Sequence, residues 1–113
     1  MHRAVRWAVL ALVLGAVPAR ADDRSDARRQ VDFGIQVAEH GLWREAAYRW
    51  QRAVDIDPTY ASAWNNLAVA HENSGDFEAA REAYDRAIEL DPDNRTIQQN
   101  YDLFREINDR TNS

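Results

Sequence analysis

Apolar residues recur at helical spacing over most of this chain. Between Ser25 and Gly41, three of them (Val31, Ile35 and Ala38) follow one another at intervals of four and three residues, the spacing of one face of a helix. A neighbouring stripe contains Gln30, Phe33, Gly34 and Val37. The two stripes predict a helix from about Ser25 to just before Gly41 that is buried on two faces.

The same helical spacing of apolar residues predicts four further helices, and glycines and prolines mark their ends. Gly41 and Gly75 stand at corners that favour a positive φ angle, and Pro58 and Pro92 closely follow a helix that they cannot continue. The predicted helices are Trp43 to Ile56, Tyr60 to Asn73, Phe77 to Leu90 and about Asn94 to Asp109. The last one carries Ile97, Tyr101, Phe104 and Ile107 on one side only, as expected of a terminal helix.

Residues 41–58 recur as residues 75–92, at an offset of 34 residues. The glycine, two alanines, an arginine, an aspartate and the proline are identical in the two copies. A period of this length predicts one helical hairpin per unit, with successive hairpins stacked side by side. Such a stack has a concave face that can hold another chain, so the pattern favours a binding function.

The residues of the second unit resemble those of a tetratricopeptide repeat: Trp64, Leu67, Ala68, Gly75, Phe77, Ala80, Tyr84, Ala87 and Pro92. The first unit matches with Phe33, Gly34, Gly41, Trp43, Ala46, Trp50, Ala53 and Pro58, and has Gln30 where the family has a large apolar residue. The resemblance implies an all-α fold, an α-solenoid of two tetratricopeptide hairpins plus a C-terminal capping helix. We expect a linker over residues 22–26, repeat units over 27–60 and 61–94, and the capping helix and tail over 95–113.

Small and aromatic residues explain the spacing of the repeat. Gly34 with Ala68, and Ala46 with Ala80, are expected where the helices of a hairpin cross, because larger side chains would push the helices apart. The aromatic residues of each second helix should then pack between neighbouring hairpins. The aromatic residues concerned are Trp43, Trp50, Phe77 and Tyr84. The tryptophans Trp43, Trp50 and Trp64 therefore predict a core and no cofactor site.

The first 21 residues have the layout of a secretory signal peptide. Basic residues up to Arg6 precede an apolar run from Trp7 to Val17, and Ala19 and Ala21 match a small-residue cleavage site. The run is shorter than the roughly 20 residues of a membrane-spanning helix. We expect a signal peptide over residues 1–21, an exported protein that is periplasmic or secreted, and no stable membrane span after cleavage; an uncleaved anchor is the alternative.

Charge and cysteine content narrow the class of partner. Without residues 1–21, 11 arginines face 19 acidic residues, a net charge of −8, and cysteine is absent from the whole chain. A charge of this sign favours neutral or basic protein partners and repels nucleic acid. The sequence also excludes disulfides and lipid attachment through a cysteine.

The family resemblance also implies a ligand groove on the first helix of each unit. The implied positions are Arg28, Val31, Ile35 and Ala38, then Ser62, Asn65, Val69 and Glu72, then Thr96, Gln99, Leu103 and Glu106. Of these, Ile35, Val69 and Leu103 form an apolar stripe that either receives a peptide or only packs the superhelix. The positions that grip an acidic C-terminal peptide in similar proteins hold Val31, Ile35 and Asn65, and only the asparagine suits that task.

Catalytic chemistry is not indicated. His40 and His71 have no histidine or cysteine partner at metal-ligand spacing, and we expect no catalytic residue, metal or cofactor. The sequence predicts a non-enzymatic protein-protein interaction module with a peptide or protein in its groove. The alternative is a structural or assembly subunit that completes its helical stack by self-association, as a homo-oligomer, or within a larger envelope complex.

Overall fold

The computed structural model describes residues 20–112, and this part of the chain contains five α-helices and no strand. The all-α fold is therefore confirmed. The second and fourth helices have the predicted bounds, and the others differ by one to four residues at an end. The helices are α1 (Ala21–Glu39), α2 (Trp43–Ile56), α3 (Ala61–Asn73), α4 (Phe77–Leu90) and α5 (Arg95–Asn112).

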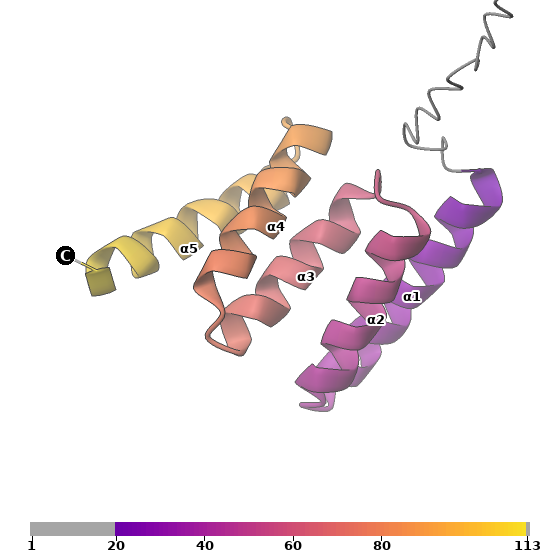
Figure 1. The fold of residues 1–113 in the computed structure, drawn as a ribbon, viewed down its shortest axis with the longest axis horizontal. Helices are drawn as coiled ribbons and strands as arrows, with labels where there is room; N and C mark the ends of the chain where they lie inside the picture. Colours follow the sequence, from indigo (N-terminus) through magenta and orange to yellow (C-terminus); the bar gives the residue numbers. More distant parts are fainter. Residues whose placement is uncertain (1–19, 113) are drawn as a thin grey trace, which may run out of the picture.

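The helices form two antiparallel hairpins and a cap. Helices α1 and α2 make the first hairpin, α3 and α4 make the second, and the two hairpins pack side by side through α2 and α3 (Figure 1). Helix α5 lies against α4 and also touches α3, at the opposite end of the molecule from α1 (Figure 1). This order places α3 between α1 on one side and α5 on the other.

Each hairpin turns at a glycine with a left-handed backbone. Gly41 and Gly75 have φ angles of 77° and 79°, which glycine adopts without the steric cost that other residues meet. At the first turn the amide of Leu42 donates to the carbonyl of Val37 at 2.9 Å, and at the second Asp76 donates to His71 at 2.9 Å. These bonds satisfy carbonyls that the helix ends leave open.

Small residues let the helices of each hairpin approach closely, as predicted. Ala46, Ala68 and Ala80 are fully buried, and Gly34 is buried beneath the indole of Trp50. A Cβ atom on Gly34 would lie 2.3 Å from Nε1 of Trp50, so only glycine fits there. The indole nitrogen donates to the carbonyl of Val31 at 3.1 Å, which fixes α2 across α1.

Aromatic rings hold α5 against the second hairpin. Tyr84 of α4 lies 5.4 Å, between ring centroids, from both Tyr101 and Phe104 of α5. Tyr84 and Phe104 are almost fully buried. Tyr84 and Phe104 form one buried cluster with Ala68, Ala80 and Ala83, and Ile97 is buried nearer the start of α5.

The first helix begins earlier than predicted. It starts at Ala21, so residues 22–26, expected to be a linker, form its first turn and a half. These residues contain no apolar side chain to show a periodic pattern; instead, two acids in the first turn favour the helix start, and Arg24 is tied to Asp57 and Thr59 beyond α2. The predicted signal peptide lies outside the described residues except for its last two positions.

Candidate functional site: a groove along α3

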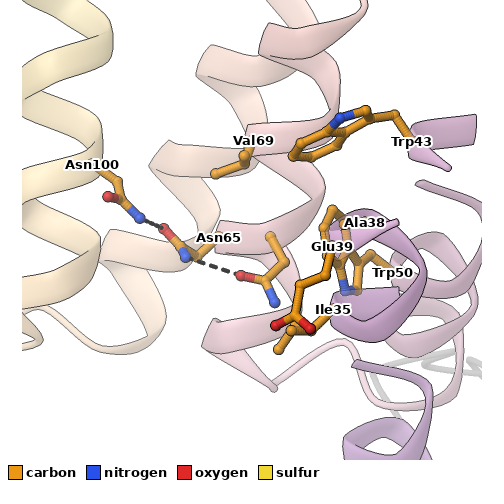
Figure 2. A pocket seen from close by; sticks show the side chains of 9 residues that line it. Ile35, Ala38, Glu39, Trp43, Trp50, Asn65, Val69 and Asn100 are labelled. Atoms are coloured by element: carbon orange, nitrogen blue, oxygen red, sulfur yellow. Dashed lines mark hydrogen bonds between the residues drawn. The ribbon is translucent and has the colours of Figure 1, made fainter. Parts of the chain in front are cut away.

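A groove follows α3 between the walls formed by α1 and α5. Its middle is a hollow of about 360 Å³ (Figure 2), which continues into one of about 340 Å³ near the start of α3 and one of about 260 Å³ near its end. The first two share Ile35, Asn65 and Asn66, and the first and third share Trp43 and Val69. The three hollows are thus one continuous feature, called here the α3 groove.

The middle of the α3 groove has an apolar wall. Ile35 and Ala38 come from α1, Trp43 from α2 and Val69 from α3, and the ring of Trp43 points toward Val69 (Figure 2). Ile35 keeps 39% of its surface exposed, so it remains accessible to a bound chain. The buried ring of Trp50 closes the floor.

Three asparagine side chains form a ladder across the groove. Asn100 of α5 donates from Nδ2 to Oδ1 of Asn65 at 3.1 Å, and Asn65 donates from Nδ2 to Oδ1 of Asn66 at 3.2 Å (Figure 2). Asn65 is 6% exposed and is held by both neighbours. Among the described residues, Nδ2 of Asn66 and the oxygen of Asn100 have no hydrogen-bond partner. A donor and an acceptor are therefore available on the groove surface.

The charges of the α3 groove are all acidic. Its charged lining residues are Asp32, Glu39 and Glu72. Glu72 accepts a hydrogen bond from the hydroxyl of Tyr84, which orients its carboxylate at the end of α3. Burial raises the pKa of Tyr84 far above its ordinary value, and the neighbouring carboxylate raises it further, so the tyrosine stays a neutral donor.

The predicted groove residues divide into two groups. Ile35, Asn65 and Val69 line the middle hollow, while Val31 and Glu72 lie at its two extensions. Several of the other implied positions also line it, namely Ala38, Ser62 and Thr96.

Arg28, Gln99 and Leu103 are exposed and line none of the three hollows. Gln99 lies outside the hollows because α5 is oriented so that Asn100, and not Gln99, faces Asn65. Sequence reasoning missed Asn100 and Asn66. A signal existed, because the two asparagines stand 34 residues apart, one full repeat.

Two aromatic residues are less buried than predicted. Phe77 begins α4 and is 48% exposed, and the ring of Phe104 lies 6.5 Å from its ring between centroids. Trp43, at the matching position of α2, is half-buried and lines the groove. The first residue of each second helix thus lies at an edge of the core, whereas Trp50 and Tyr84, two turns later, occupy its centre.

Comparison with known proteins identifies the repeat. A model of the tetratricopeptide repeat matches residues 61–94, and a second tetratricopeptide model matches residues 38–75. The chain belongs to the tetratricopeptide repeat family. Its fold agrees with the crystal structure of the Sgt2 tetratricopeptide domain from Aspergillus fumigatus, with a TM-score of 0.72 over 78% of this chain and 60% of that chain at 21% identity. The α-solenoid expected from the sequence is thereby confirmed.

Similar tetratricopeptide sequences occur in proteins of several kinds. The chain is 35% identical over 45% of its length to the heat-shock protein cognate co-chaperone sgt12 of Aspergillus fumigatus, of which it covers 15%. It is 34% identical over 59% of its length to protein O-mannosyl-transferase TMTC1 of Mus musculus, of which it covers 7%. An uncharacterised protein of Methanocaldococcus jannaschii is 31% identical over 51% of this chain and 67% of its own. The chain thus spans a small part of the two named relatives.

Membrane-spanning helices and metal-ligand clusters are both absent from residues 20–112. No helix there is long and apolar enough to cross a membrane. In the same range, no group of three or more histidine, aspartate or glutamate side chains is arranged to hold a metal ion.

Proposed function

We propose that the protein is a non-enzymatic protein-protein interaction module that holds an extended segment of its partner in the α3 groove. The observation that carries this proposal is the combination, in one open groove, of an apolar wall and hydrogen-bonding groups without partners among the described residues. The similarity to a co-chaperone also supports a role in protein binding.

The apolar wall and the asparagine side chains of the groove would contact different parts of a bound peptide. An apolar side chain of the partner would enter the space between Ile35, Trp43 and Val69 and supply most of the affinity. Asn66 and Asn100 would hydrogen-bond the partner's backbone and fix its position along α3. Because Asn65 is already engaged on both sides, its task is to hold these two amides in place.

The similarity to a mannosyl-transferase does not indicate a transferase here. The match extends over 67 residues of this chain and covers 7% of that protein.

The test is peptide binding by the wild-type protein and two variants. A panel of synthetic peptides that alternate aliphatic and polar residues is titrated while tryptophan fluorescence is recorded, because Trp43 lines the groove. Val69→Asp should abolish binding, since it places a charge on the apolar wall. Tyr48→Asp is the control, because Tyr48 is 53% exposed on α2 and lines none of the hollows.

Circular dichroism decides how these results are interpreted. If Val69→Asp lost its helices, Val69 would belong to the core, and Asn100→Ala on the facing wall would then be tested for weaker binding. Equal binding by wild type, Val69→Asp and Asn100→Ala would show that peptides bind elsewhere, and the proposal would be wrong.

We also propose that the protein is exported and that its mature form starts at Asp22. The support is the order of basic, apolar and small residues over positions 1–21. N-terminal sequencing of the protein from its host tests this; a first residue at Met1 would indicate an anchor or no export.

A second candidate function is self-assembly. It is favoured by Leu103 and Ile107, which are 56% and 48% exposed on α5 at the end of the stack. The mass of the protein in solution separates the two candidates.

A further inference from the structure

The charged side chains that line the α3 groove are acidic, and the described arginines lie on other surfaces. Asp32, Glu39 and Glu72 line the three hollows of the α3 groove, and no described arginine does; Arg24 lines an adjoining hollow of about 240 Å³ that shares Tyr60 and Ser62 with the start of the groove. A groove with charges of one sign and low-dielectric walls concentrates its field. The α3 groove is therefore more attractive to cations than the net charge alone implies.

Three of the arginines that could have neutralised the groove are engaged elsewhere. Arg24 binds Asp57 at the start of α1, Arg49 stacks on Phe33 with 4.3 Å from its guanidinium carbon to the ring centroid, and Arg81 faces Phe104 at 5.4 Å. The guanidinium of Arg24 also lies over the ring of Tyr60, 4.7 Å from the ring centroid, and Tyr60 lines the start of the groove. The middle and the far end of the groove, with Glu39 and Glu72, have no arginine among their lining residues.

The acids are spread over the length of the groove. Asp32 belongs to the hollow at the start of α3, Glu39 to the middle one and Glu72 to the one at its end. Helix α3 has 13 residues, which corresponds to about 20 Å at 1.5 Å per residue. An extended chain of about six residues spans that length, so one short peptide can meet all three acids.

We propose that the segment held in the α3 groove is basic and aliphatic, with arginine or lysine side chains facing Asp32, Glu39 and Glu72 and an aliphatic side chain between them. The proposal rests on the interaction function proposed above and adds the chemistry of the partner. The central aliphatic side chain meets Ile35 and Val69, while the cations meet Asp32 and Glu72 at the groove ends and Glu39 beside the middle hollow. An acidic peptide would meet only like charges there.

The experiment uses the full chain and three synthetic octapeptides that share leucines at alternate positions. The intervening residues are arginine in the first, asparagine in the second and glutamate in the third; a fourth peptide keeps the arginines and replaces leucine by serine. Binding is measured by fluorescence anisotropy of the labelled peptides. The arginine-leucine peptide should bind at least about tenfold more tightly than the asparagine-leucine peptide, and its affinity should fall as salt is raised from about 50 to about 500 mM.

Matched variants separate the groove acids from the overall charge. Asp32→Asn combined with Glu39→Gln should weaken the arginine-leucine peptide about tenfold and leave the asparagine-leucine peptide unchanged. Glu82→Gln is the control; it removes an acid that is exposed on α4 and lines none of the hollows.

Each other outcome overturns a defined part of the proposal. Equal affinity for the arginine and asparagine peptides would remove the basic character and leave the interaction function intact. Two results would show that peptides bind by non-specific charge attraction. One is equal affinity for the arginine-leucine and arginine-serine peptides. The other is a loss of affinity in Glu82→Gln that is as large, per acid removed, as in the groove variant; either result would overturn the proposal. Failure of all four peptides to bind would contradict the interaction function as well.

Discussion

Gly34 shows how a single missing side chain sets the distance between α1 and α2. A methyl group there would lie 2.3 Å from Nε1 and 2.7 Å from Cδ1 of Trp50, so the indole would have to move and give up its bond to Val31. We expect Gly34→Ala to lower the free energy of unfolding by about 2 kcal/mol, because the overpacking outweighs the better helix propensity of alanine. Urea denaturation measures this.

The second repeat supplies the matched control for Gly34. At the corresponding positions it has Ala68 and Tyr84, a larger residue beneath a smaller ring, and both are buried. Gly34→Ala combined with Trp50→Tyr should therefore be more stable than the sum of the two single changes predicts. Strict additivity would contradict a steric cause.

Asp57 joins the start of α1 to the loop after α2. It is fully buried and accepts hydrogen bonds from Arg24 and from the amide and hydroxyl of Thr59. The equivalent residue in the second repeat is Asp91, which accepts a hydrogen bond from Asn94 where Asp57 has an arginine. Asp57→Asn should lower the free energy of unfolding by about 2 kcal/mol, less than for a fully buried pair because Arg24 is partly exposed. Asp91→Asn should cost less than about 1 kcal/mol, since a neutral hydrogen bond is weaker.

The contribution of Asp57 should depend on pH. Burial raises the pKa of this carboxyl, but the hydrogen bonds from Arg24 and Thr59 outweigh burial and hold the pKa below its ordinary 3.8. A lowered pKa stabilises the fold above about pH 4, and that stabilisation is lost as the pH falls through the folded-state value. The difference in unfolding free energy between wild type and Asp57→Asn should thus be constant near neutral pH and shrink below about pH 4. A constant difference down to pH 2 would contradict the ion pair.

At the scale of the helices, the sequence predicted most accurately where backbone chemistry marks an end. The bounds of α2 and α4 were predicted correctly because a left-handed glycine precedes each and a proline follows it. The start of α1 was missed because a salt bridge and acidic residues stabilise it, and neither leaves a periodic pattern.

Only some residues of the groove wall were predicted, because the sequence pattern does not give the rotation of α5. Ile35, Asn65 and Val69 lie on helices whose orientation the hairpins fix. Helix α5 has no following helix in the described structure to fix its rotation, and its own aromatic contacts set which side faces α3. These contacts bring Asn100 to Asn65 in place of Gln99, a rotation that spacing alone does not give.

Phe104 is the most deeply buried aromatic ring of α5. Phe104 is 2% exposed and contacts Tyr84, whereas the adjacent Leu103 is 56% exposed. Phe104→Ala should cost about 3 kcal/mol and release α5, so hydrogen exchange should show lost protection over residues 95–112 and unchanged protection in α1. Leu103→Ala should cost less than about 1 kcal/mol. Uniform loss of protection in Phe104→Ala would show instead that the whole stack unfolds as one unit.

At the scale of the whole molecule, an arginine side chain covers part of the outer face of the first hairpin. Phe33 is 43% exposed at the outer side of α1, and the guanidinium of Arg49 lies over its ring, within 3.5 Å of Gln30. The second repeat has Leu67 and Ala83 at the positions of Phe33 and Arg49, and both are buried. The change to a stacked arginine gives the first unit a polar outer face, as terminal repeats require.

This asymmetry predicts the state of the protein in solution. The outer face of the first unit has Arg49 stacked on Phe33, and the large apolar side chains left exposed at the other end are Phe77, Leu103 and Ile107. Three such side chains provide a small fraction of the roughly 1,200 Å² that a stable interface buries, so we expect light scattering at micromolar concentration to give the mass of one chain, with the α3 groove open to a partner. A dimer that Leu103→Asp dissociates would instead establish self-assembly through α5. If Leu103→Asp and wild type both have the mass of one chain, the exposed end of α5 has no role in association at this concentration.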